Sequence, residues 1–160
     1  MGDSIAFLEK TLERLLEWIR AADAKIPPVL AISTSMLAVV AALFPDADSW
    51  DLISAGAGIL AIIPLVICLI LLFLASFPQT NGPTNSLIFF EGITMNDSST
   101  YSTKVKIMTE QEYIMDLAEQ CYRNAEIASS KYWLLKCAMK SLFFSLIPWL
   151  FFVFILYRGR

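Results

Sequence analysis

The residues best suited to bind a small charged ligand are cations, polar groups and an aromatic ring beside two long apolar segments. A cation attracts an anion, a carboxylate or amide can bond to the edge of a flat ring, and an aromatic face can stack on it. These candidates are Arg20, Asp23, Lys25, Asn124, Lys131 and Tyr132. A competing interpretation makes Lys25, Lys131 and Lys136 ordinary cytoplasmic anchors of membrane helices, with Trp18 and Tyr132 at the membrane interface.

Residues for the common catalytic and metal-binding arrangements are missing. The chain has no histidine, which excludes a Ser-His-Asp or Cys-His arrangement and removes the commonest metal ligand. Its 3 cysteines are widely spaced and predict neither a disulfide framework nor a zinc site. The acidic residues Glu110, Glu112 and Asp116 follow Thr109 and are explained by a helix-capping box and the helix dipole. We therefore expect no enzymatic activity, no cofactor and no bound metal.

Three apolar segments dominate the sequence of 160 residues, which is 57% hydrophobic and only 17% charged. That composition is too apolar for an ordinary soluble domain. Residues 26–44, 52–77 and 141–157 contain no charged side chain. As helices they are long enough to cross a hydrocarbon core of about 30 Å. We predict an all-α membrane protein with three transmembrane helices, the first two forming a hairpin over residues 26–77.

The distribution of Lys and Arg predicts the orientation of the chain in the membrane. Residues 1–25 and 78–140 carry most of these cations, whereas the loop at 45–51 carries none and holds three aspartates. Because cytoplasmic segments are enriched in Lys and Arg, we expect the N-terminus and residues 78–140 to be cytoplasmic. The short loop and the C-terminus should lie outside, although Arg158 and Arg160 count against the second placement. The cytoplasmic segments have no basic stripe, so a nucleic-acid partner is not expected.

The segments outside the spans predict a small helical domain. Residues 4–25 have apolar side chains at three- and four-residue spacing, which indicates an amphipathic helix that bends into the first span at Pro27-Pro28. The run at 86–90 fits either a short strand or a surface segment, and residues 98–107 fit either a short helix or a strand. The capping box at Thr109 begins one long helix that continues through the third span to about Tyr157.

Small side chains gather on one face of the second span. Ser54 and Gly58, and likewise Ala57 and Ala61, are four residues apart and would let another helix approach closely. Two interpretations remain open at this point. The face packs against the first span of the same chain, or it joins copies of the chain into a homo-oligomer.

Three short segments together resemble a known family. They are Trp18-Ile-Arg-Ala-Ala-Asp-Ala-Lys25 before the first span, Ser86-Leu-Ile-Phe-Phe90 after the second, and Asn124-Ala-Glu-Ile-Ala-Ser-Ser-Lys-Tyr132 before the third. In this order they resemble the transmembrane effectors of Pycsar, a bacterial antiphage system, over almost the whole chain. Pro27-Pro28 departs from the family, which more often has small residues at that place.

The resemblance implies a function. A companion cyclase would make cyclic CMP or cyclic UMP on infection, and the nucleotide would activate the effector in the bacterial inner membrane. The activated effector would impair that membrane and cause abortive infection. Residues 78–140 would then be the sensing region, and the six candidate residues named first would bind the nucleotide. The alternative is a constitutive membrane scaffold or subunit that binds a protein partner through its cytoplasmic helices.

Overall fold

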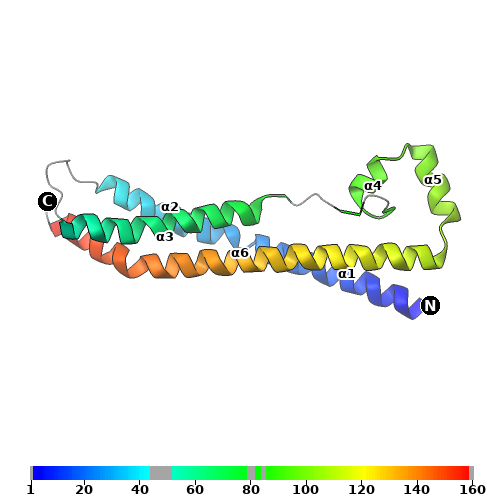
Figure 1. Ribbon diagram of the computed structural model, residues 1–160, viewed down its shortest axis with the longest axis horizontal. Coiled ribbons are helices and arrows are strands. Elements are labelled where there is room, and N and C mark those ends of the chain that lie inside the picture. Colours follow the sequence, from blue (N-terminus) through cyan, green and yellow to red (C-terminus); the bar gives the residue numbers. More distant parts are fainter. Residues whose placement is uncertain (1, 44–51, 79–81, 84–85, 159–160) are drawn as a thin grey trace. The chain divides into compact units, whose positions relative to one another are not determined.

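The computed structural model describes residues 2–43, 52–78, 82–83 and 86–158. These residues form helices and no strand (Figure 1). The helices are α1 (Gly2–Asp23), α2 (Ile26–Ala42), α3 (Leu52–Ser76), α4 (Phe90–Thr94), α5 (Ser98–Ile107) and α6 (Glu110–Arg158). The chain forms two compact units. The first contains Met1–Ala21 and Pro78–Ser130, and the second contains Ala22–Phe77 and Lys131–Arg160.

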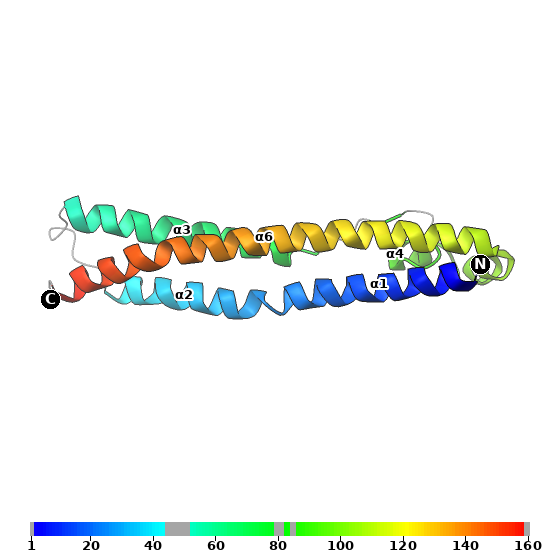
Figure 2. The ribbon, with the colours of Figure 1, turned by 90° about the horizontal axis from the view of Figure 1, so that it is seen from below.

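In the second unit, α2, α3 and the C-terminal part of α6 lie side by side (Figures 1 and 2). The helix α3 runs antiparallel to the other two, so its Gly58 meets Phe152 of α6 while its Pro64 carbonyl oxygen accepts a 2.7 Å hydrogen bond from Ser141. Trp149 of α6 donates its indole N–H to the Met36 carbonyl oxygen of α2 at 2.9 Å. Two apolar clusters complete the packing, one around Cys68 and Leu72 and the other around Ala61 and Phe152.

Three helical stretches among the described residues are long and apolar enough to cross a membrane: Gly2–Ala42, Leu52–Ser76 and Glu110–Arg158. Within residues 26–43, 52–77 and 141–157 of these stretches, the outward-facing side chains are mostly aliphatic and aromatic. In α3 these include Ile59, Ile63, Ile70 and Phe73, each more than half exposed. Such a surface is suited to lipid rather than to water. The prediction of an all-α protein with three transmembrane helices is confirmed, and this is a multi-pass membrane protein.

The first unit is built from α1 as far as Ala21, the short helices α4 and α5, and the N-terminal part of α6. Here α1 and α6 run in parallel (Figure 2). Tyr113 donates its hydroxyl to Glu9 at 2.8 Å, and the Cys121 thiol donates to the Leu8 carbonyl oxygen at 3.4 Å. The apolar stripe of α1 is partly covered, with Leu15 buried and Leu8, Leu12 and Ile19 half-buried, as its three- and four-residue spacing predicts.

Two open points of the sequence analysis are decided by the structure. Residues 98–107 form a helix because Asp97 caps it, accepting a 3.2 Å hydrogen bond from the Thr100 N–H. The run at 86–90 is irregular up to Phe89 and enters α4 at Phe90, so the strand considered for it does not form. The loop at 45–51 and Arg160 lie outside the described residues, as does Phe44, the predicted end of the first span.

The bend between α1 and α2 lies just before the paired prolines. A turn at Ala24 and Lys25 separates the two helices, with the Lys25 N–H bonded to the Ala22 carbonyl oxygen at 3.0 Å. Pro27 and Pro28 fall in the first turn of α2, where a missing N–H has no partner within the helix anyway. The prolines therefore begin the second helix rather than kink a continuous one.

Candidate ligand site

Four of the six candidate residues from the sequence meet in the second unit as two pairs. The Lys131 ammonium lies 2.5 Å from Asp23 Oδ1, with the lysine side chain 9% and the aspartate side chain 45% exposed. The Lys25 ammonium lies over the Tyr132 ring, 5.4 Å from its centroid. Each cation thus already has a partner, and Lys25 occupies one face of the Tyr132 ring.

The other two candidates belong to the first unit. Asn124 donates its side-chain amide to the Gln120 carbonyl oxygen at 2.8 Å, and Arg20 is exposed. The structure therefore joins Asp23 to Lys131 and Lys25 to Tyr132, and a single site holding all six residues stays a prediction. Four cavities of about 340 to 700 Å³ are lined by other residues.

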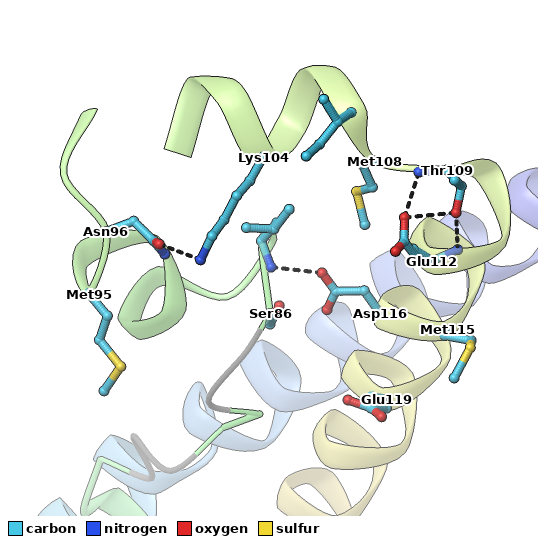
Figure 3. Close-up of a pocket in the computed structure, with 12 residues that line it drawn as sticks. Ser86, Met95, Asn96, Lys104, Met108, Thr109, Glu112, Met115, Asp116 and Glu119 are labelled. Atoms are coloured by element: carbon cyan, nitrogen blue, oxygen red, sulfur yellow. Dashed lines mark hydrogen bonds between the residues drawn. The ribbon is translucent and has the colours of Figure 1, made fainter. Parts of the chain in front are cut away.

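A cavity of about 620 Å³ in the first unit carries the densest collection of functional groups. Figure 3 shows it between α5, the segment that leads into α4, and α6. The residues that line it are Ser86, Leu87, Met95, Asn96, Lys104, Ile107, Met108, Thr109, Glu112, Met115, Asp116 and Glu119. Its volume falls in the range of small-molecule sites in proteins.

The floor of the cavity depends on a turn that buried polar side chains hold in place. The Ser86 hydroxyl accepts hydrogen bonds from the Ile88 and Phe89 N–H groups at 3.1 and 2.9 Å, and from the Gln120 amide at 3.0 Å. The Leu87 N–H donates to Asp116 Oδ2 at 2.8 Å. Because Ser86, Gln120 and Asp116 are each at least nine-tenths buried, these bonds fix the segment on α6.

Gly92 lets α4 approach the same turn. A Cβ atom at this position would lie 2.1 Å from the Ser86 carbonyl oxygen, which is backbone and cannot rotate away. No larger side chain fits there without moving the turn. The close approach keeps Met95 and Asn96, which follow in the chain, at the cavity.

The walls of the cavity come from α5 and the beginning of α6. Lys104 donates its ammonium to Asn96 Oδ1 at 2.7 Å, and the Asn96 amide donates to the Gly92 carbonyl oxygen at 2.7 Å. At the start of α6, Glu112 accepts hydrogen bonds from the Thr109 N–H at 2.7 Å and from its hydroxyl at 2.8 Å. These bonds lower the pKa of Glu112 and form the capping box predicted from the sequence.

One carboxylate oxygen of Asp116, a residue that lines this cavity, has no partner. Asp116 is 8% exposed, and its Oδ1 atom is buried with no hydrogen bond from the part of the chain that the structure describes. A buried polar atom without a partner is costly and uncommon. The sequence analysis missed this residue because Asp116 was explained by its place in the first turns of α6. The signal available was its position on the buried face of α6, next to Leu117.

Comparison with known families decides the class of this protein. The model of the family described as the Pycsar effector protein domain matches residues 7–158, nearly the whole chain. The chain belongs to this family. No curated protein and no solved structure matches it.

Membership in the Pycsar effector family fits what the residues offer. The family supplies the antiphage effector of its system, acting downstream of the cyclase. Among the described residues no group of three or more His, Cys, Asp or Glu side chains is arranged to hold a metal ion. The cavity of this Pycsar effector offers one cation, several hydrogen-bonding groups and three flexible methionines with which a ligand could be recognised.

The small-residue face of this Pycsar effector is covered within the chain. Ser54, Ala57, Gly58 and Ala61 are all buried, and Phe152 packs directly on Gly58. The structure has an intramolecular contact at this face, with Val40 of α2 and Phe152 of α6 in the same cluster. Packing of the face between copies of the chain stays a prediction. Self-association through this face would require Phe152 to leave it.

Proposed function

We propose that this Pycsar effector senses a cyclic pyrimidine mononucleotide, cyclic CMP or cyclic UMP, and impairs the bacterial inner membrane, causing abortive infection. Family membership supports the antiphage role, and the three membrane-capable helices support the bilayer as the target. The observation that carries the proposal is that one continuous helix, α6, both lines the cavity and contains a segment apolar enough to cross the membrane. It supplies Glu112, Met115, Asp116 and Glu119 to the cavity wall and then continues as the third membrane-capable segment.

The proposed damage is a leak with little ion selectivity. Residues 26–44, 52–77 and 141–157 contain no charged side chain from which a charged selectivity ring could be built. Their inner faces are instead closed by apolar clusters and by a few hydrogen bonds, such as that from Trp149 to Met36. A nucleotide opens this packing only if it binds the active arrangement more tightly than the resting one.

The active state in this proposal is a homo-oligomer. Once Phe152 leaves Gly58, the face formed by Ser54, Ala57, Gly58 and Ala61 can pack against the same face of another copy. Close helix approach through small residues is the usual basis of such association in lipid. The resting protomer keeps this face covered, which explains how the protein can exist in the membrane without damaging it.

Dye release from liposomes that contain the purified protein tests the proposal. We expect release on addition of cyclic CMP or cyclic UMP and none with cyclic AMP, which serves as the control ligand. Equal release in all conditions would contradict the claim that the nucleotide opens the membrane leak. If one ion species is released and the larger dye is retained, the leak is selective. That result would contradict the proposed unselective leak but would still support gating by the nucleotide.

The scaffold alternative makes the opposite prediction in the same preparation. A constitutive membrane subunit would neither bind a cyclic nucleotide nor change the permeability of the liposome when one is added. Equilibrium dialysis with radiolabelled cyclic CMP and cyclic UMP therefore separates the two functions before any leak is measured.

A further inference from the structure

The unpartnered oxygen of Asp116 requires a hydrogen-bond donor. Its carboxylate uses Oδ2 for the Leu87 N–H, while Oδ1 is buried without a partner, and Asp116 is one of the residues that line the cavity (Figure 3). A carboxylate oxygen accepts hydrogen bonds and does not donate them. A ligand that enters the cavity and replaces the packing over Oδ1 with an N–H group would give this oxygen the hydrogen bond that the protein does not supply.

Lys104 supplies the opposite chemistry from α5. Its ammonium has three protons, and the hydrogen bond to Asn96 Oδ1 uses one of them. Asn96 is itself fixed by the bond of its amide to the Gly92 carbonyl oxygen, so the ammonium is held at the cavity instead of moving freely. An anionic oxygen at this place would form a charge-assisted hydrogen bond.

The remaining walls suit a flat apolar ring. Met95, Met108 and Met115 line the cavity together with Leu87 and Ile107. Methionine is flexible and polarisable, and it packs well against aromatic rings. The cavity thus combines an acceptor for an N–H edge, a cation for an anion and soft apolar sides.

We propose that this cavity binds the activating ligand, with a nucleobase N–H edge on Asp116 Oδ1 and the phosphate on Lys104 Nζ. The assignment rests on the proposed function, and it gives the ligand contacts to residues other than the candidates Lys25 and Lys131. Cytosine offers its 4-amino group and uracil its N3–H, so both bases meet the requirement of Oδ1. Both nucleotides carry one negative charge for Lys104.

Methionine methyl NMR tests the location without any substitution. The chain has 6 methionines, of which Met95, Met108 and Met115 line the cavity, and Met36 and Met139 belong to the second unit. In protein labelled at the methionine methyl carbon, cyclic CMP or cyclic UMP should first perturb the three cavity signals. Saturable binding that leaves these three signals unchanged would overturn the assignment.

Substitution of Lys104 tests the contact with the anion. We expect Lys104→Met to weaken nucleotide binding by about tenfold to a hundredfold, the loss of one hydrogen bond to a charged group. Lys106→Met is the matched control, because Lys106 is exposed on the same helix and does not line the cavity. Equal affinities for Lys104→Met and the parent would overturn the role of Lys104.

Substitution of Asp116 tests the contact with the base. In Asp116→Asn the amide oxygen can keep the Leu87 N–H, but the atom that replaces Oδ1 becomes a donor instead of an acceptor. We expect nucleotide binding to weaken by about tenfold or more. Glu13→Gln on α1 is the control for loss of one negative charge, since Glu13 is exposed. The helix content of Asp116→Asn, measured by circular dichroism, should match that of the parent. If the variant has lost helix content, the methyl NMR experiment on the parent protein decides where the ligand binds.

The outcomes separate this assignment from the function on which it rests. Nucleotide-dependent leakage by the Lys104→Met and Asp116→Asn variants at the parent's nucleotide concentrations would overturn the cavity while the function stands. Weakened binding in Lys25→Met with normal binding in Lys104→Met would also overturn it, in favour of the residues beside the spans. If the parent protein does not bind either nucleotide, both the assignment of the cavity and the proposed function are overturned.

Discussion

Lys131 and Asp23 form an ion pair in which the two partners are unequally buried. The ammonium lies 2.5 Å from Asp23 Oδ1, and the lysine side chain is 9% exposed whereas the aspartate side chain is 45% exposed. Loss of the aspartate would leave a buried ammonium without its partner. Loss of the lysine would leave a carboxylate that water can still reach. The energetic consequences of removing either partner are therefore different.

We expect Asp23→Ala to destabilise the protein by about 1–3 kcal/mol, and Lys131→Met by less than about 1 kcal/mol. The half exposure of Asp23 keeps the first figure below that of a fully buried pair. Thermal unfolding in detergent measures both changes. The double variant Asp23→Ala/Lys131→Met should recover much of the stability lost in Asp23→Ala, and equal losses in the two single variants would contradict the unequal burial.

The contact between Gly58 and Phe152 predicts a large effect from one added methyl group. A Cβ atom at Gly58 would lie 3.0 Å from Phe152 Cζ and 3.1 Å from Cε2, and the Phe152 side chain is fully buried. We expect Gly58→Ala to lower the stability in detergent by about 1–3 kcal/mol, as for an overpacked core. Gly56→Ala is the matched control, because its Cβ position meets no atom within 4 Å apart from the neighbouring backbone of its own helix. If both variants lose the same stability, the loss comes from replacing a helical glycine in general and not from the contact with Phe152.

The capping box at the start of α6 predicts a pH-dependent stability. Hydrogen bonds from Thr109 lower the pKa of Glu112 in the folded protein below its unfolded value. The stabilisation is therefore present above the unfolded pKa and disappears as the pH falls through the lowered folded pKa. The melting temperature of the parent should exceed that of Glu112→Gln at neutral pH, and the difference should shrink in acid. Glu110→Gln, in the same turn, is the control and should follow the parent, and a difference between parent and Glu112→Gln that is constant with pH would argue against the cap.

The Lys and Arg asymmetry of the sequence predicts which segments can be labelled from outside the cell. Cysteines introduced at Asp48 and Arg160 should react with an impermeant maleimide in intact spheroplasts, whereas one at Ser99 should react only after lysis. Ser99 is exposed on α5 and accessible once the membrane is opened. Reaction of the Ser99 variant in intact spheroplasts would reverse the orientation. The parent's own cysteines, of which Cys68 and Cys121 are buried, provide the background signal.

The sequence by itself determined the helices and their apolar character. Hydrophobic segments of 17 residues or more without charge leave no other stable structure in lipid, since every backbone group must be bonded within the segment. Local signals were likewise sufficient for the cap at Thr109 and the amphipathic stripe of α1. They were insufficient between residues 86 and 107, where short runs fit a strand or a helix until the Asp97 cap and the contacts to α6 decide.

Only the tertiary structure decided which polar residues have partners. Sequence alone places Lys131 and Asp116 among many charged side chains on the same helix, and it does not tell which is neutralised. The fold pairs Lys131 with Asp23, which is 108 positions away in the sequence. It leaves one oxygen of Asp116 buried without a hydrogen-bond partner among the described residues. Likewise, the small face around Gly58 was visible in the sequence, but its cover, Phe152, is brought there by the antiparallel packing of α3 on α6. Such pairings depend on burial and on contacts between residues distant in the chain, which no local pattern records.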